Sequence, residues 1–124
     1  MLIAVVLVNS GTGFIASPAD ADKYYIVDLS SRSVLSGPHN LPEEGPGLAR
    51  LGALVFASMR ITSGDKIFVV SRIGYEGFEL LKSLGIDVRI FRGSLADLLT
   101  TGGNSIEKHV EPVKDCPCCG IRRR

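Results

Sequence analysis

The sequence predicts a single α/β domain built on a five-stranded mixed sheet. Three observations lead to this fold class. Residues 2–8 form a continuous apolar run, residues 24–29 and 33–35 alternate as a pair of short strands, and residues 65–99 hold two successive strand-helix units. A chain of 124 residues is the usual size for one hydrophobic core, so these elements are expected to share it.

The first strand is expected at the centre of the sheet. Residues 2–8 are rich in β-branched side chains and contain no charge, which is typical of a strand covered on both faces. Turn-forming residues follow at 9–13, and loop composition continues through residues 17–22. So long a loop in so small a domain often faces a ligand.

The next segment predicts an antiparallel hairpin followed by a second long loop. Residues 24–29 and 33–35 are the two strands, and three polar residues connect them. Residues 36–47 are too rich in proline and glycine for regular structure, so we expect a loop there.

Helical periodicity first appears in residues 48–60, and an apolar strand follows at 66–70. The next helix is expected to end at Gly85, since glycine commonly terminates a helix in the left-handed conformation. Its buried face should carry Phe78, Leu81 and Leu84.

The last strand-helix unit begins with a short strand at residues 87–91. Ser94 is the expected N-cap of the following helix, which should end at Gly102-Gly103. Strands joined through helices are parallel with right-handed crossovers, so the two late strands should lie on the other side of the first strand from the hairpin, with helices on the faces of the sheet. We expect the domain to span residues 1–111, and residues 112–124 to form a flexible tail containing Cys and Arg.

Composition excludes some classes of partner. The formal net charge is only +1, so no global field attracts nucleic acid or an anionic membrane. The apolar run at the start is well short of a membrane span and lacks the basic flank of a signal peptide. We therefore expect a cytoplasmic protein that binds neither nucleic acid nor membranes.

Residues 73–88 resemble the signature segment of the dinitrogenase iron-molybdenum cofactor biosynthesis family, which includes NifX-like proteins and resembles the C-terminal part of NifB. The positions in register are Ile73, Gly74, Phe78, Glu79, Leu81, Lys82, Gly85 and Ile86. Residues 93–97 resemble the start of the family's last helix, and Ser17-Pro18 occurs at the matching place near the front. The resemblance covers roughly residues 1–100.

This resemblance implies a ribonuclease H-like fold and a non-enzymatic role. Such a protein would bind or carry an Fe-S or Mo-Fe-S cluster, and its partner would be a metallocofactor or an apo-acceptor protein. The ligand site would be formed by the loops at residues 10–22 and 38–47. The candidate residues that bind the cofactor are Ser10, Gly11, Gly13, Ser17, His39, Gly45, Gly47 and Gly74.

The sequence departs from the family pattern at two positions that matter for ligands. After Ser-Pro the family usually has His-Phe-Gly-Arg, whereas residues 19–22 here read Ala-Asp-Ala-Asp. The family's His-Gly-Gly corresponds to residues 43–47, where glycines remain at 45 and 47 but histidine does not. His39 lies nearby, out of register.

The cysteines are the candidate metal ligands, and all of them lie in the tail. Cys116, Cys118 and Cys119 could hold a soft metal or one corner of an Fe-S cluster, although the adjacent pair cannot both reach one metal without a strained turn. A complete tetrahedral site needs about four ligands, and His109 or a second subunit could supply the missing one. Two alternatives stay open: a flexible tail of reduced thiols, and a redox dithiol formed by Cys116 and Cys118.

We find no convincing catalytic constellation. The turn at residues 10–14 could present N–H groups to a phosphate, but it lacks a P-loop lysine, so a plain turn is favoured. The first strand contains no carboxylate for nuclease chemistry. Neither His39 nor His109 is expected to pair with a nucleophile. The sequence thus favours a cluster binder or carrier, with a regulatory interaction module that has lost the ligand, or a thiol redox protein, as alternatives.

Overall fold

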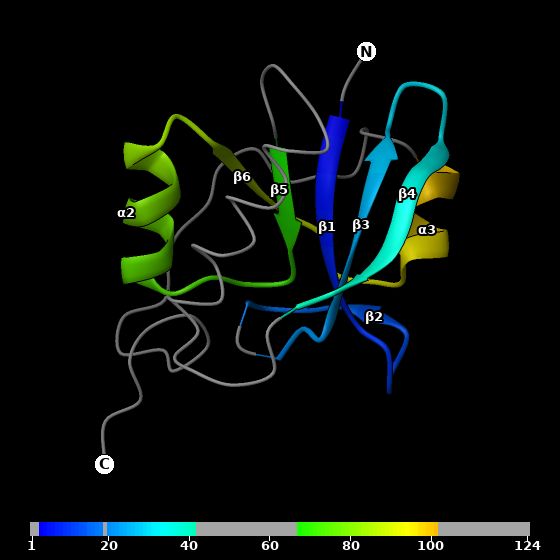
Figure 1. The fold of residues 1–124 in the computed structure, drawn as a ribbon, viewed down its shortest axis with the longest axis horizontal. Coiled ribbons are helices and arrows are strands. Elements are labelled where there is room, and N and C mark those ends of the chain that lie inside the picture. The colour runs from blue at the N-terminus through cyan, green and yellow to red at the C-terminus, as the bar shows by residue number, and fades with distance from the viewer. Residues whose placement is uncertain (1–2, 19, 42–66, 102–124) are drawn as a thin grey trace.

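The structure is a computed structural model, and it describes residues 3–18, 20–41 and 67–101 of the chain (Figure 1). These residues form a mixed α/β fold, as the sequence predicts. The elements in chain order are β1 (Ile3–Asn9), β2 (Phe14–Ile15), β3 (Lys23–Asp28), β4 (Ser33–Asn40), β5 (Ile67–Val70), α2 (Tyr75–Ser83), β6 (Asp87–Ile90) and α3 (Leu95–Thr101).

The sheet has the predicted path, with one strand more than predicted. Its order is β4-β3-β1-β5-β6; β3 and β4 run antiparallel on one side of β1, and β5 and β6 run parallel to β1 on the other (Figure 1). The sixth strand, β2, pairs antiparallel with β1 at Val8↔Ile15 and Asn9↔Phe14. The prediction of five strands was wrong because the turn after β1 reverses the chain within a few residues, with Gly13 at a φ of 77°, which lets the next two residues pair.

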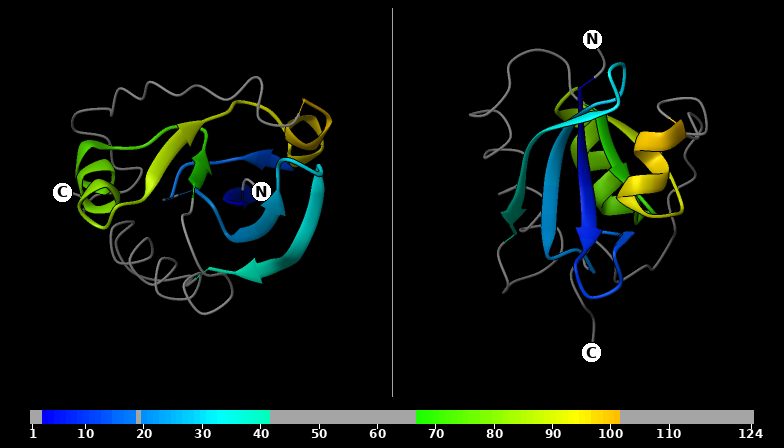
Figure 2. Two further views of the ribbon diagram at one scale, coloured as in Figure 1. Left: turned by 90° about the horizontal axis from the view of Figure 1, so that it is seen from above. Right: turned by 90° about the vertical axis from the view of Figure 1, so that its right-hand side faces the viewer.

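The core lies on both faces of β1, as a central strand requires. Val5 packs in a cluster with Phe68 of β5 and Leu81 of α2, and Val6 packs in a second cluster with Leu98 of α3. Because successive strand residues point to opposite faces, the two helices cover opposite faces of the sheet (Figure 2). Full burial of each such side chain contributes about 1.5–3 kcal/mol to stability.

The edge strand β4 corrects the prediction of a loop from residue 36 onward. It continues through Gly37 and Pro38 to Asn40, pairing with β3 down to Lys23↔Asn40. Glycine and proline are tolerated here because an edge strand needs ladder hydrogen bonds on one side only. The pairing with β3 has register shifts on both sides of Ile26.

The predicted signals for the end of α2 and the start of α3 are confirmed, but the predicted burial of Leu84 is wrong. Gly85 has a φ of 75° and terminates α2 as expected, and Ser94 caps α3, with its Oγ accepting a hydrogen bond from the N–H of Asp97 at 3.0 Å. Leu84, predicted on the buried face, is 53% exposed. It is the C-cap residue of α2, where the backbone has left the helical conformation and the helical face no longer continues.

Several predicted features lie outside the described residues. They are the helix at 48–60, the end of the last helix at 102–103, and the tail at 112–124 with the domain boundary before it. Among the described helices, none has the length and apolar character needed to cross a membrane.

Candidate functional site

The carboxyl ends of β1 and β5 meet at one edge of the sheet, the lower edge in Figure 1. In open α/β sheets this edge is the usual place for ligands. The segment 10–22 follows β1 and the segment 71–74 follows β5, and a hydrogen bond from Ser71 N–H to the Ala16 carbonyl at 3.3 Å joins them. This edge is therefore the candidate site.

Asn9 organises the turn that follows β1. Its side-chain Oδ1 accepts hydrogen bonds from Gly11 N–H at 2.9 Å and Thr12 N–H at 3.3 Å, and its carbonyl accepts one from Gly13 N–H at 2.8 Å. Its Nδ2 donates to the carbonyl of Asp20 at 2.8 Å, on the far side of the loop. The turn is an Asx turn, so the N–H groups of Gly11 and Gly13 already have acceptors inside the protein.

The Asp22 side chain accepts the hydrogen bonds that the Ser10 donors of the same turn can make. Its carboxylate accepts a hydrogen bond from Ser10 N–H at 2.7 Å and a second one from the Ser10 hydroxyl. These bonds, the hydroxyl's first, hold the pKa of Asp22 below its usual range, against the opposing effect of burial. An anionic ligand that used the donors of Ser10 would have to displace this carboxylate.

Ser17 and Gly74 lie deeper at the same edge. Ser17 is 1% exposed, its hydroxyl donates to the Asp20 carboxylate at 3.1 Å, and its carbonyl accepts the N–H groups of Asp20 and Ala21. Gly74 is buried and is the N-cap residue of α2, with its carbonyl accepting Phe78 N–H at 3.0 Å. The structure thus brings Ser10, Gly11, Gly13, Ser17 and Gly74 to two connected segments.

His39 lies near the end of β4. It lies opposite Tyr24 of β3, with the two ring centroids 4.9 Å apart. Its Nε2 is 2.6 Å from the Ser36 hydroxyl, a contact that the sequence did not predict. Burial raises the pKa of the Tyr24 phenol, which keeps that ring neutral.

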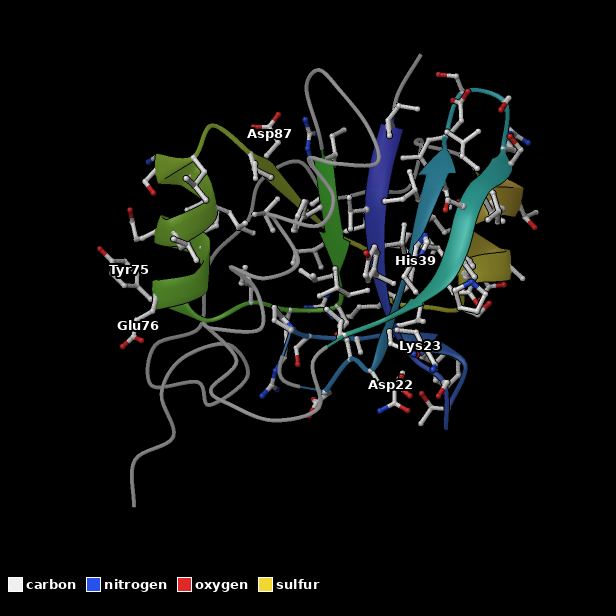
Figure 3. The ribbon with its side chains drawn as sticks, in the orientation of Figure 1. Asp22, Lys23, His39, Tyr75, Glu76 and Asp87 are labelled. Carbon is white, nitrogen blue, oxygen red and sulfur yellow. The ribbon has the colours of Figure 1, made fainter. Side chains whose placement is uncertain are left out.

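Several polar side chains lie close together where β3 begins and β4 ends (Figure 3). Asp22, Lys23 and His39 gather where β3 begins and β4 ends, whereas Tyr75 and Glu76 lie at the opposite side, on α2. The Lys23 ammonium hydrogen bonds to the side-chain oxygen of Asn40, its partner across the strand pair. Polar groups at the start of β3 and the end of β4 therefore border the candidate edge.

The part of the chain that the structure describes contains no group of three or more His, Cys, Asp or Glu side chains placed to hold a metal ion. The predicted site residues Gly45, Gly47, Cys116, Cys118 and Cys119 lie outside that part, as does His109.

Sequence reasoning missed Asn9, Asp22 and Ser36. Asn9 had a readable signal, because asparagine directly after a strand and before a glycine-rich turn favours an Asx turn. Asp22 and Ser36 had none, since their partners depend on which residues the tertiary fold brings opposite one another.

Comparisons with known proteins support the fold. No family model matches the chain, and no curated protein matches it. A solved NMR structure, described as "a putative NifB protein from Thermotoga" of the DUF35 family, is similar with a TM-score of 0.59 and 20% sequence identity. The match covers 94% of this chain and 100% of that chain. At this identity the likeness concerns the fold.

Proposed function

We propose that the protein is a non-enzymatic binder or carrier of a metallocluster, of the Fe-S or Mo-Fe-S type. The observation that carries this proposal is the fold likeness to a nif-related protein over 94% of the chain. The segment 73–88, which resembles the nitrogenase cofactor family, also supports the proposal. In the structure this segment comprises α2 and the start of β6. We also propose that the fold is of the ribonuclease H-like type, since three antiparallel strands precede two parallel ones in the order β4-β3-β1-β5-β6.

The cysteines are the proposed cluster ligands. Thiolates are the ligands that Fe-S clusters prefer, and all of the protein's cysteines are Cys116, Cys118 and Cys119. Within the described residues the carboxylates at the candidate edge already accept internal hydrogen bonds, and His39 is hydrogen bonded to Ser36. The edge loops would then form the surface against which the cluster rests, with His109 or a second subunit as the further ligand.

A carrier must transfer its cluster to another protein, so we expect its partner to be an acceptor of the cluster. We propose an apo-acceptor protein that takes the cluster from thiolates in a cytoplasmic, reducing environment, where cysteines stay reduced. Neither nucleic acid nor a membrane is part of the proposal, in keeping with the net charge of +1.

Anaerobic reconstitution tests the proposal. The full-length protein is incubated with ferrous iron, sulfide and molybdate, desalted, and its metal content is measured beside that of a Cys116→Ser, Cys118→Ser, Cys119→Ser triple variant. We expect the wild type to retain iron with a thiolate charge-transfer absorption, and the triple variant to lose both. Absence of retained metal in both proteins would refute cluster binding, and equal retention would move the ligands away from the tail.

A regulatory interaction module is the second candidate. The internal hydrogen bonds of Ser10, Gly11 and Gly13 favour it, because these loop donors are occupied without any ligand. This module predicts a protein that retains no metal after reconstitution but still binds a partner.

A thiol redox protein would instead show rapid alkylation of Cys116 or Cys118 below about pH 7, from a depressed thiol pKa.

A further inference from the structure

The pairing of β3 with β4 contains an extra residue next to His39. Between the pairs Tyr24↔His39 and Ile26↔Ser36, β3 advances by two residues while β4 advances by three. Side chains three residues apart in a regular strand point to opposite faces of a sheet. The extra residue removes this separation, so Ser36 and His39 lie on the same face and their side chains meet.

Gly37 makes this bulge possible. Its φ is 120°, in a region that side chains disfavour. A Cβ at this position would lie 3.1 Å from the Tyr24 carbonyl oxygen and 3.1 Å from the Tyr25 Cα, both of which are backbone atoms. The close approach of the two strands therefore requires glycine, and the glycine stands between the two polar residues that the bulge brings together.

The pair has the contacts of an activated hydroxyl. The Ser36 Oγ is 2.6 Å from His39 Nε2, which accepts the hydroxyl hydrogen in the tautomer protonated on Nδ1. The imidazole lies against the Tyr24 ring, tilted by 32°, and Tyr24 is only 5% exposed. The Tyr24 ring thus restrains the imidazole, while Ser36 and His39 are both half-buried and keep access to solvent. A nucleophile within hydrogen-bond reach of a base, with the base oriented by a third group, is the diagnostic arrangement of nucleophilic chemistry.

We propose that Ser36 is a reactive serine that His39 activates, and that it accepts acyl groups from activated esters. The Ser36 Oγ forms a bond to the ester carbonyl carbon, and the bond from that carbon to the leaving oxygen breaks. The hydroxyl proton passes to His39 Nε2 and then to the leaving alkoxide, which departs as an alcohol. The products are O-acylated Ser36 and the alcohol, with no change in oxidation state.

This reactivity is separate from the proposed metallocluster function. It uses β4 and β3 alone and requires none of the tail cysteines, so the reconstitution experiment and the acylation experiment can fail independently.

The same hairpin contains a matched control. The hydroxyls of Ser31 and Ser33 also lie 2.6 Å apart, and both residues are exposed. The Ser31 side chain also hydrogen bonds to the Asp28 carboxylate, whereas the neighbour of the Ser33 hydroxyl is a hydroxyl and not an imidazole. If exposure or a short hydrogen bond alone made a serine reactive, Ser33 would react as fast as Ser36. If the imidazole is the cause, only Ser36 reacts.

The experiment uses 4-nitrophenyl acetate on the full-length protein, with acetylated positions mapped by peptide mass spectrometry. General base assistance typically contributes about 10²–10⁴-fold, so Ser36 should acetylate at least about 100-fold faster than Ser33. At the peptide level, Ser36→Ala should remove the fast-acetylated position, His39→Gln should abolish fast acetylation at Ser36, and Ser33→Ala should keep it.

Chemical rescue separates base chemistry from a structural role. Free imidazole should restore acetylation of Ser36 in His39→Ala, while circular dichroism checks that each variant is folded. Equal acetylation of Ser33 and Ser36, or an unchanged rate at Ser36 in folded His39→Gln, would overturn the proposal.

Discussion

The β5-α2-β6 unit and the β3-β4 hairpin lie on opposite sides of β1 and are built differently. All four residues of β5 are buried, and its pairing with β6 runs through four residue pairs without a shift. In β4 no residue is buried, and its pairing with β3 shifts register twice. The central strand β5 is thus regular and apolar, while the edge strand β4 is irregular and exposed or half-buried.

The contrast between β4 and β5 indicates which strands can present side chains to a ligand. A strand buried on both faces cannot present side chains to a ligand, so β5 contributes only through the loop after it. An edge strand has one face and one side free, and β4 uses them for Ser36, His39 and Asn40. The exposed edge strand β4 therefore offers polar side chains to solvent, whereas the buried strand β5 does not.

The largest expected effect contrasts a buried and an exposed apolar residue. Phe68→Ala in β5 removes a fully buried ring and should lower the free energy of unfolding by about 3–5 kcal/mol. Leu35→Ala in β4, where the side chain is 52% exposed, should change it by less than about 0.5 kcal/mol. Urea denaturation measures both, and a large loss in Leu35→Ala would mean that β4 also contributes to the core.

An intermediate effect contrasts two glycines with positive φ. Gly37→Ala in β4 combines backbone strain with a Cβ 3.1 Å from two backbone atoms, and should cost about 3 kcal/mol. Gly85→Ala after α2 meets nothing within 4 Å and should cost about 1 kcal/mol for strain alone. Thermal and urea unfolding give the two values. Equal losses would contradict the close approach of β3 and β4 at Gly37.

The smallest expected effect is a loss of stability at acidic pH, caused by Asp22 and Asp28 at the two ends of β3. Burial alone would raise the pKa of Asp28, but hydrogen bonds from the N–H groups of Ser30 and Ser31 outweigh it and lower the pKa, and Ser10 lowers the pKa of Asp22. A carboxyl whose pKa is lower in the folded state stabilises the fold above its unfolded pKa, about 3.9 for Asp, and loses this contribution as the pH falls through the folded value.

Stability should therefore decrease below about pH 4, and Asp22→Asn and Asp28→Asn should each make that decrease shallower. Urea midpoints at pH 3 and pH 7 measure it. Asp87→Asn is the control, because this side chain is 72% exposed and its ion-pair partner is Arg89 on the same strand. A shallower slope in the control alone would assign the acid sensitivity to the parallel side.

Prediction from sequence succeeded on the parallel side for a local reason. The runs of β1 and β5, the glycine after α2 and the Ser94 cap are signals within a few residues, and each element follows from its own segment. Prediction failed for β2 because a strand of two residues is too short to show a periodicity, and for the second half of β4 because Gly37 and Pro38 have the composition of a loop. Only pairing with β1 and β3 makes strands of them.

The sequence by itself determined the α/β class, the central position of β1, and the side of β1 on which each later strand lies. Hydrophobic periodicity and the handedness of crossovers are sufficient for these. The tertiary structure alone decided which polar groups meet. Ser10 and Asp22 are twelve residues apart, and Ser36 meets His39 only because of a bulge opposite β3. Such contacts depend on the register of strand pairing, which no single segment encodes.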